Sequence, residues 1–171
     1  MKKKVLHIAA HLATGIGKAV SGLTIELNRY YQNEIVLLES TRQERFVNLC
    51  KENGVSVDVV TDIFELKARI EAADYVIFNW WGHPLSLKMY KVLKETKARV
   101  FMWSHVNGWH YPYISPEFVE MVDGAFFTSA CTSENEKWTP EQRSRVAGNT
   151  EILYGIGLFK AGNIHSKEDY Q

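Results

Sequence analysis

Residues 99–110 read Arg-Val-Phe-Met-Trp-Ser-His-Val-Asn-Gly-Trp-His, an apolar run that ends abruptly in polar and aromatic side chains. The part from 100 to 103 is short, unbroken and rich in β-formers, which is typical of a strand buried on both faces of a parallel sheet. Ser104, His105, Asn107 and Gly108 follow at its carboxyl end. Ligands of open α/β sheets bind outside the carboxyl ends of the strands. The sequence therefore predicts a functional site here, with His105 at its centre.

The same pattern recurs along the chain, because short apolar runs alternate with segments of helical period. This alternation predicts a doubly wound, Rossmann-like α/β domain with a mainly parallel sheet of about seven strands. We expect this single domain to span residues 1–157, and 158–171 to be a tail or a severed interdomain linker. Strands are expected at 4–10, 34–38, 57–60, 74–79, 100–103, 124–128 and 151–154. Helix starts are expected at capping boxes that begin with Thr41, Asp62, Ser133 and Thr139, and at Pro84 and Pro116.

Charge and composition exclude several classes of function. The 20 basic and 20 acidic residues cancel, so no field of one sign attracts nucleic acid. The apolar segment that follows the first lysines ends at His11, which is too short for a signal peptide or a membrane span. We expect a cytoplasmic protein, or one peripheral to a membrane. Cys50 and Cys131 lie far apart, which favours reduced thiols over a disulfide or a zinc site.

A glycine segment, Thr14-Gly-Ile-Gly17, lies between the first strand and a helix whose apolar face is expected at Val20, Leu23, Leu27 and Tyr30. Backbone N–H groups at such a helix start can face a phosphate or a carboxylate. The segment lacks the lysine of a P-loop. It half fits a dinucleotide fingerprint. Gly15-x-Gly17 and the Glu39 that ends the second strand agree with that pattern, but Val20 stands where glycine or alanine is expected. Anion binding is the favoured interpretation, and a simple turn is the alternative.

His105 is a candidate general acid or base, or a neutral donor to a substrate oxygen, and a structural histidine is the alternative. His83 and His110 follow strands in the same way, whereas His7 is expected in the core. A zinc site at His105 and His110 lacks a third ligand. Aromatic side chains near the ends of the fourth and fifth strands suit sugars or lipid-linked groups, and the alternative is that several fill the core or the seam to a second domain. They are Trp80, Trp81, Trp103, Trp109, Tyr111 and Tyr113, of which Trp109 and Tyr111 are expected to be exposed.

With these features the chain resembles the amino-terminal half of a family-4 (group 1) glycosyltransferase of the GT-B type. The resemblance rests on the Gly15-Ile-Gly17 segment with its helix, the strand at 74–79, the strand that ends at His105, and residues 122–129 before a helix. Residues 152–156 are similar to the point where the family crosses into its second domain. There the family usually reads asparagine, glycine, a hydrophobic residue and aspartate, whereas this chain has Tyr154-Gly-Ile-Gly157.

The resemblance implies an acceptor-side domain of a retaining enzyme that moves a sugar from a nucleotide-sugar to a sugar or lipid-linked acceptor. It implies that His105 acts near the anomeric carbon, and that the glycine segment approaches the acceptor or the donor's diphosphate. It implies no metal and no cofactor, since the nucleotide-sugar is a substrate. Most of the donor site would belong to a missing carboxyl-terminal domain, so we expect this chain alone to be inactive. The substrate-binding residues are then expected to be Thr14, Gly15, Ile16, Gly17, His83, Asn107 and Trp109.

Two alternatives remain open. One is a non-catalytic Rossmann-like module that binds a nucleotide at the glycine segment or serves as a protein-interaction surface. The other is a dinucleotide-dependent enzyme in which Glu39 contacts a ribose.

Overall fold

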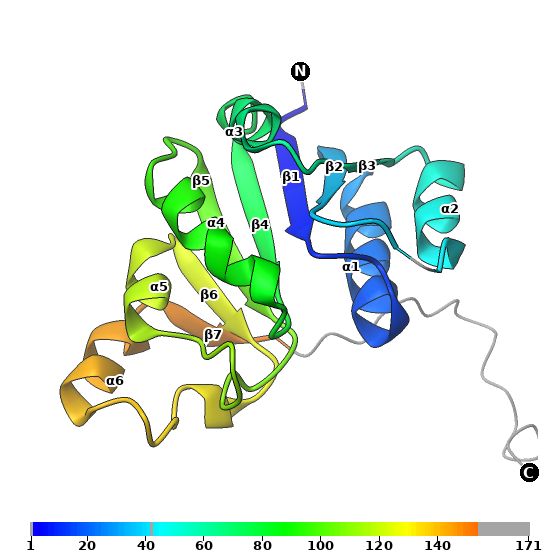
Figure 1. The fold of residues 1–171 in the computed structure, drawn as a ribbon. Coiled ribbons are helices and arrows are strands. Elements are labelled where there is room, and N and C mark those ends of the chain that lie inside the picture. The colour runs from blue at the N-terminus through cyan, green and yellow to red at the C-terminus, as the bar shows by residue number, and fades with distance from the viewer. Residues whose placement is uncertain (1, 42, 154–171) are drawn as a thin grey trace, which may run out of the picture.

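The architecture is one seven-stranded parallel sheet with helices on both faces, and it is seen in a computed structural model that describes residues 2–41 and 43–153 (Figure 1). Every neighbouring pair of strands is parallel, and the order is β3-β2-β1-β4-β5-β6-β7. This confirms the expected Rossmann-like α/β domain. The strands are β1 (Lys4–Ala9), β2 (Gln32–Leu37), β3 (Ser56–Val59), β4 (Tyr75–Trp80), β5 (Arg99–Ser104), β6 (Gly124–Phe127) and β7 (Thr150–Ile152).

The helices divide between the two faces of the sheet. Helices α1 and α2 lie on one side of it, and α3, α4 and α5 lie on the other (Figure 1). The strand order reverses between β1 and β4, because β2 and β3 are added to the sheet on one side of β1 while β5 to β7 are added on the far side of β4. The helices are α1 (Thr14–Leu27), α2 (Arg45–Glu52), α3 (Ile63–Glu71), α4 (Pro84–Lys94), α5 (Pro116–Met121) and α6 (Pro140–Ala147), with a 3₁₀ helix η1 (Ala130–Thr132).

Two apolar cores hold these layers together, one on each face. Successive side chains of a strand point to opposite faces, so β1 sends Leu6 and Ile8 to one core and Ala9 to the other. The larger core packs β1, β4, β5 and β6 against α3 to α6, and the smaller one packs β1 and β2 against α1 and α2. A fully buried leucine or isoleucine contributes about 1.5–3 kcal/mol. The two cores therefore hold the helices against the two faces of the sheet.

Most of the expected helix starts are confirmed. The carboxylate of Asp62 accepts hydrogen bonds from the amides of Phe64 and Glu65, both at 2.8 Å. Thr139 opens a complete capping box with Gln142. Pro84 and Pro116 each occupy the first turn of a helix, after His83 and Ser115 respectively.

Two capping boxes are wrong, and both fail for the same reason. The hydroxyl of Thr41 bonds the backbone of Gln43 instead of a helix amide, and α2 begins four residues later. The hydroxyl of Ser133 donates to the carbonyl of Ala130, at the end of η1. Serine and threonine side chains can bond nearby backbone in turns as well as in caps, so the three-residue spacing alone does not define a helix start. Tyr30 is also misplaced, because α1 ends at Leu27 and the tyrosine ring is exposed.

Several expectations concern parts of the chain outside the described residues. These are the crossover at 154–157, the last residue of the seventh expected strand, the domain boundary at 157 and the tail at 158–171. Within the described ranges, none of the helices is both long enough and apolar enough to cross a bilayer. Cys50 and Cys131 are both free thiols, as expected; Cys50 is buried and Cys131 partly exposed.

Candidate functional site

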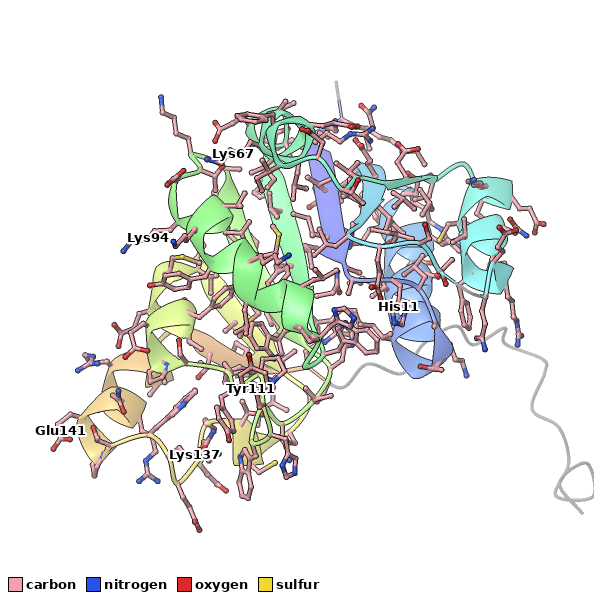
Figure 2. All side chains as sticks on the ribbon, in the orientation of Figure 1. His11, Lys67, Lys94, Tyr111, Lys137 and Glu141 are labelled. Atoms are coloured by element: carbon pink, nitrogen blue, oxygen red, sulfur yellow. The ribbon has the colours of Figure 1, made fainter. Side chains whose placement is uncertain are left out.

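Four polar side chains follow the carboxyl ends of neighbouring strands at the point where the strand order switches. His11 follows β1, Glu39 follows β2, His83 follows β4 and His105 follows β5. Figure 2 shows His11 and Tyr111 at the edge of the sheet toward which the strand arrows point, with Lys137 and Glu141 farther down. This is the edge at which doubly wound sheets bind their ligands. The expected location of the site is therefore a place where the fold gathers chemical groups.

His105 is held by a buried amide. The Nε2 atom of His105 lies 3.1 Å from Oδ1 of Asn79, whose Nδ2 donates to the carbonyls of Ile8 (3.2 Å) and Ile77 (3.3 Å). Because these two carbonyls fix which end of the amide is the donor, Oδ1 faces the ring and Nε2 must carry the proton. The ring of Trp103 packs against the imidazole, with the centroids 4.3 Å apart. The Nδ1 of His105 is then left as a hydrogen-bond acceptor.

The charge of His105 follows from its surroundings. Burial lowers the pKa of His105 from 6.5 to about 4, so the ring is neutral at pH 7. In the described ranges the hydrogen bond of this ring is made by Nε2, and none is made by Nδ1. A neutral imidazole with a free Nδ1 can accept a hydrogen bond from a substrate hydroxyl. It does not carry the extra proton that a general acid would need at this pH.

The glycine segment is the first turn of α1, not a loop before it. The helix begins at Thr14, whose φ of 55° is unusual for a β-branched residue. The amide of Gly17 already donates to the carbonyl of Ala13 at 3.1 Å, whereas the amides of residues 14–16 precede the first helical hydrogen bond. No side chain caps this end of the helix. Its backbone amides could therefore bind an anion, while the buried side chain of Ile16 belongs to the core.

Gly17 has a packing role that the anion interpretation did not anticipate. A Cβ at this position would lie 2.6 Å from Cδ2 of Phe46 and 2.9 Å from the backbone carbon of Leu12. A Cβ at Gly15 would meet nothing within 4 Å. Gly15 thus leaves the start of the helix open. Gly17 lets α1 pack closely against the backbone of Leu12 and against Phe46 of α2.

A cluster of His11, Glu39 and His83, which was not predicted from the sequence, lies where the strand order reverses. Oε1 of Glu39 is 3.2 Å from Nε2 of His83 and 3.7 Å from Nε2 of His11. His83 also caps α4, because its Nδ1 accepts the amide of Leu85 at 3.3 Å. Burial lowers the pKa of His11, against the opposing effect of Glu39. The sequence did contain an indication of this cluster, because His11 and Glu39 each follow a strand just as His105 does.

A cavity of about 520 Å³ opens beside this cluster. It is lined by His11, Ala13, Glu39, Ser40 and Gln43, so it also adjoins the residue that precedes the first turn of α1. Trp81 packs against the two histidines of the cluster, with its ring stacked on His83 (5.4 Å, 8°) and in edge contact with His11 (4.3 Å, 83°).

The remaining candidate residues lie in the loop after β5. Oδ1 of Asn107 accepts the amide of Trp109 at 3.1 Å, and the indole N–H of Trp109 donates to the carbonyl of Cys131 at 3.0 Å. Trp109 and Tyr111 are exposed, as expected, at 37% and 70%. Other aromatic residues of the expected cluster, Trp80 and Trp103, are buried in the core. His7 is also buried, bonded to Asn33, as expected.

The structure thus brings His105, His83 and the start of α1 to one edge of the sheet. Within the described ranges, His83 contacts His11, Glu39 and Trp81, and no interaction joins it to His105.

Comparisons with known proteins show which folds this chain is similar to. Neither a family model nor a curated protein sequence matches the chain. Among solved structures, a glycosyltransferase from Rickettsia africae is similar at 13% identity and a TM-score of 0.61, and the match covers 89% of this chain and 42% of the Rickettsia chain. The lipopolysaccharide outer core galactosyltransferase WaaB matches 88% of this chain and 45% of its own, at 15% identity and 0.61. TcCGT1 in complex with UDP matches 90% of this chain and 51% of its own, at 11% identity and 0.59.

The chain therefore spans about half the length of these proteins, or less. At such low identities the likeness shows a shared Rossmann-like α/β fold of the kind found in half of a GT-B glycosyltransferase. BdcA from E. coli also matches, over 88% of this chain and 96% of its own, at 12% identity and a TM-score of 0.53.

Proposed function

We propose that this chain is the acceptor-side domain of a retaining GT-B glycosyltransferase, which moves a sugar from a nucleotide-sugar to a sugar or lipid-linked acceptor. The observation that carries the proposal is the match of about nine tenths of this chain to about half, or less, of each of three longer proteins, two of which are named as glycosyltransferases. The third was solved with UDP. The placement of His105 and the α1 start at the carboxyl edge of the sheet supports the same reading.

In this proposal His105 orients the transferred sugar. Its Nδ1 accepts a hydrogen bond from a sugar hydroxyl near the anomeric carbon, while Asn79 holds the ring in the required tautomer. This role needs a neutral ring, which agrees with the lowered pKa. Transfer of the sugar with its stereochemistry kept would then depend on this contact for the position of the donor.

The start of α1 and the β5 loop supply the remaining contacts. The amides of Thr14, Gly15 and Ile16 face a diphosphate or carboxylate group, with Gly17 holding the turn in place. The exposed ring of Trp109, positioned by Asn107, offers an apolar face to a sugar ring. His83 borders the same edge. We propose these as substrate contacts, with the nucleotide-sugar as substrate and no cofactor in the transfer step.

The proposal requires a second domain, in cis or in trans, to hold most of the donor. The 171 residues alone are then expected to bind a nucleotide-sugar weakly and to turn over nothing. We propose a place in the cytoplasm, or at the surface of a membrane where a lipid-linked acceptor would be presented.

The test uses the full reading frame that contains this chain, read beyond Gln171. If it encodes a second α/β domain, the whole protein is assayed for release of nucleoside diphosphate from UDP- and GDP-sugars in the presence of candidate acceptors. We expect His105→Ala to lower kcat by about 100-fold, the order of the loss when a reacting group is misplaced by about 1 Å. His110→Ala, an exposed histidine of the same loop, is the matched control and should keep full activity.

Two results would overturn the proposal. One is a His105→Ala protein that transfers sugar as well as the unaltered protein. The other is tight binding of NAD by the chain, which would favour the dinucleotide-dependent alternative. A frame that stops at residue 171, with no partner domain and no sugar transfer, would favour the non-catalytic module.

A further inference from the structure

Three potential metal ligands, His11, Glu39 and His83, come together from the segments that follow three different strands. One ligand atom of each residue lies within 4.8 Å of the other two. In a tetrahedral zinc site with bonds of about 2.0–2.1 Å, two donor atoms lie about 3.3 Å apart. The Nε2–Oε1 separations of 3.2 Å and 3.7 Å fall on either side of that value. The three groups need only small side-chain shifts to share one ion.

His11 lacks the hydrogen bonds that a half-buried imidazole normally makes. Its Nδ1 is buried and has no partner, and 3.7 Å is too long for a hydrogen bond from Nε2 to Glu39. The edge contact with Trp81 holds the ring in place with Nε2 toward the carboxylate. Among the described residues nothing hydrogen-bonds Nε2, the atom that faces Glu39, so an ion bound there would supply the contact that the ring lacks at that atom.

We propose that His11, Glu39 and His83 form a binding site for a divalent transition-metal ion of the zinc class. Both Nε2 atoms and the Glu39 carboxylate would be the ligands, and the 520 Å³ cavity would leave a coordination position open to water or to a further ligand. Two imidazoles and one carboxylate suit zinc and its neighbours in the first transition series. They do not suit magnesium or calcium, which take oxygen ligands. This departs from the expectation of no metal, and it assigns the ion no step in sugar transfer.

The hydrogen bonds of the other nitrogen of each histidine ring predict how tightly the ion is held. Metal-bound histidines usually donate their other N–H to an acceptor, and losing such a partner costs about 10- to 100-fold in affinity. Here Nδ1 of His11 has no acceptor, and Nδ1 of His83 accepts the amide of Leu85. Binding through Nε2 places a proton on Nδ1 of His83, so the Leu85 amide loses its acceptor. The site is therefore loosely occupied and exchangeable, and the ion loosens the start of α4.

The proposal is tested by titrating the whole chain with Co²⁺, followed by its visible absorption, and with Zn²⁺ in competition with a chromophoric chelator. We expect one ion per chain, with an affinity at least tenfold weaker in His11→Ala and in Glu39→Gln. His110→Ala is the matched control for loss of one exposed histidine. His165→Ala controls for the histidine outside the described residues. Both controls should bind as the unaltered chain does.

Two further measurements separate loss of the site from loss of the fold. Thermal unfolding without metal should be nearly unchanged in Glu39→Gln, which keeps the shape of the side chain. Amide exchange at Leu85 should become faster when Zn²⁺ is added. Absence of saturable binding, or equal affinity in all variants, would overturn the proposal. Because the probe is the metal alone, this outcome does not depend on whether the chain belongs to a glycosyltransferase.

Discussion

At the scale of single residues, one buried amide determines what the central histidine can do. Asn79 lies on β4 and bonds the carbonyl of Ile8 on β1 and the ring of His105 after β5. It therefore connects three adjacent strands and selects the tautomer of the imidazole. The sequence predicted the position of His105 from the end of its strand. It could not predict the tautomer, because Asn79 lies 26 residues away in the chain.

The lowered pKa values of His7 and His105, each about 4, make stability depend on pH. An unfolded histidine titrates near 6.5, so between about pH 6.5 and pH 4 the unfolded chain binds more protons than the folded one. The contribution of each group is complete above about pH 6.5 and is lost as the pH falls toward 4. The slope of the unfolding free energy against pH is proportional to the number of protons taken up on unfolding. We expect His105→Gln to reduce that number by about one in this window. Urea unfolding at several pH values measures it, and an unchanged slope would contradict the buried, neutral ring.

The two glycines at the start of α1 should respond differently to the same substitution. Gly17→Ala places a methyl group against Phe46 and the backbone of Leu12, so we expect a loss of about 1–3 kcal/mol in the free energy of unfolding. Gly15→Ala meets open space at a helical position and should be neutral or stabilising, by up to about 1 kcal/mol. Urea denaturation of both variants gives the comparison. Equal losses would show that Gly17 is not the point of close approach.

At the scale of elements, capping residues and prolines predicted the start of a helix correctly at four positions. Asp62 and Thr139 cap as their spacing indicates, and Pro84 and Pro116 stand in first turns. Thr41 has the same spacing but bonds within its own turn, two residues on. Which of the two arrangements forms depends on where the following apolar face meets the sheet, and that is a property of tertiary packing.

The capping boxes at Thr139 and Ser133 provide a matched pair of tests. The hydroxyl of Thr139 accepts the amide of Gln142, so Thr139→Ala should cost about 0.5–2 kcal/mol. Ser133→Ala removes only a bond to the carbonyl of Ala130 and should cost clearly less. Hydrogen exchange of the α6 amides should accelerate in the first variant and not in the second. Faster exchange in both would mean that the two segments unfold together.

At the scale of the whole molecule, the order of the strands creates the candidate site. The switch between β1 and β4 separates the crossovers to the two faces, and His11, Glu39 and His83 follow strands on either side of it. The periodicity of the sequence predicted seven strands and their parallel arrangement. It did not predict which strands are neighbours, so residues 11, 39 and 83 could not be placed together before the structure was known.

The central claim is that the carboxyl edge of this sheet binds a nucleotide-sugar. The most direct measurement is an NMR titration of the isotope-labelled 171-residue chain with a UDP-sugar, and in parallel with NAD. We predict weak, saturable shifts at the amides of Thr14, Gly15 and Ile16 and at the ring of His105, with no comparable response to NAD. Unchanged resonances at these residues in the presence of every UDP- and GDP-sugar tried, or tight binding of NAD, would contradict it.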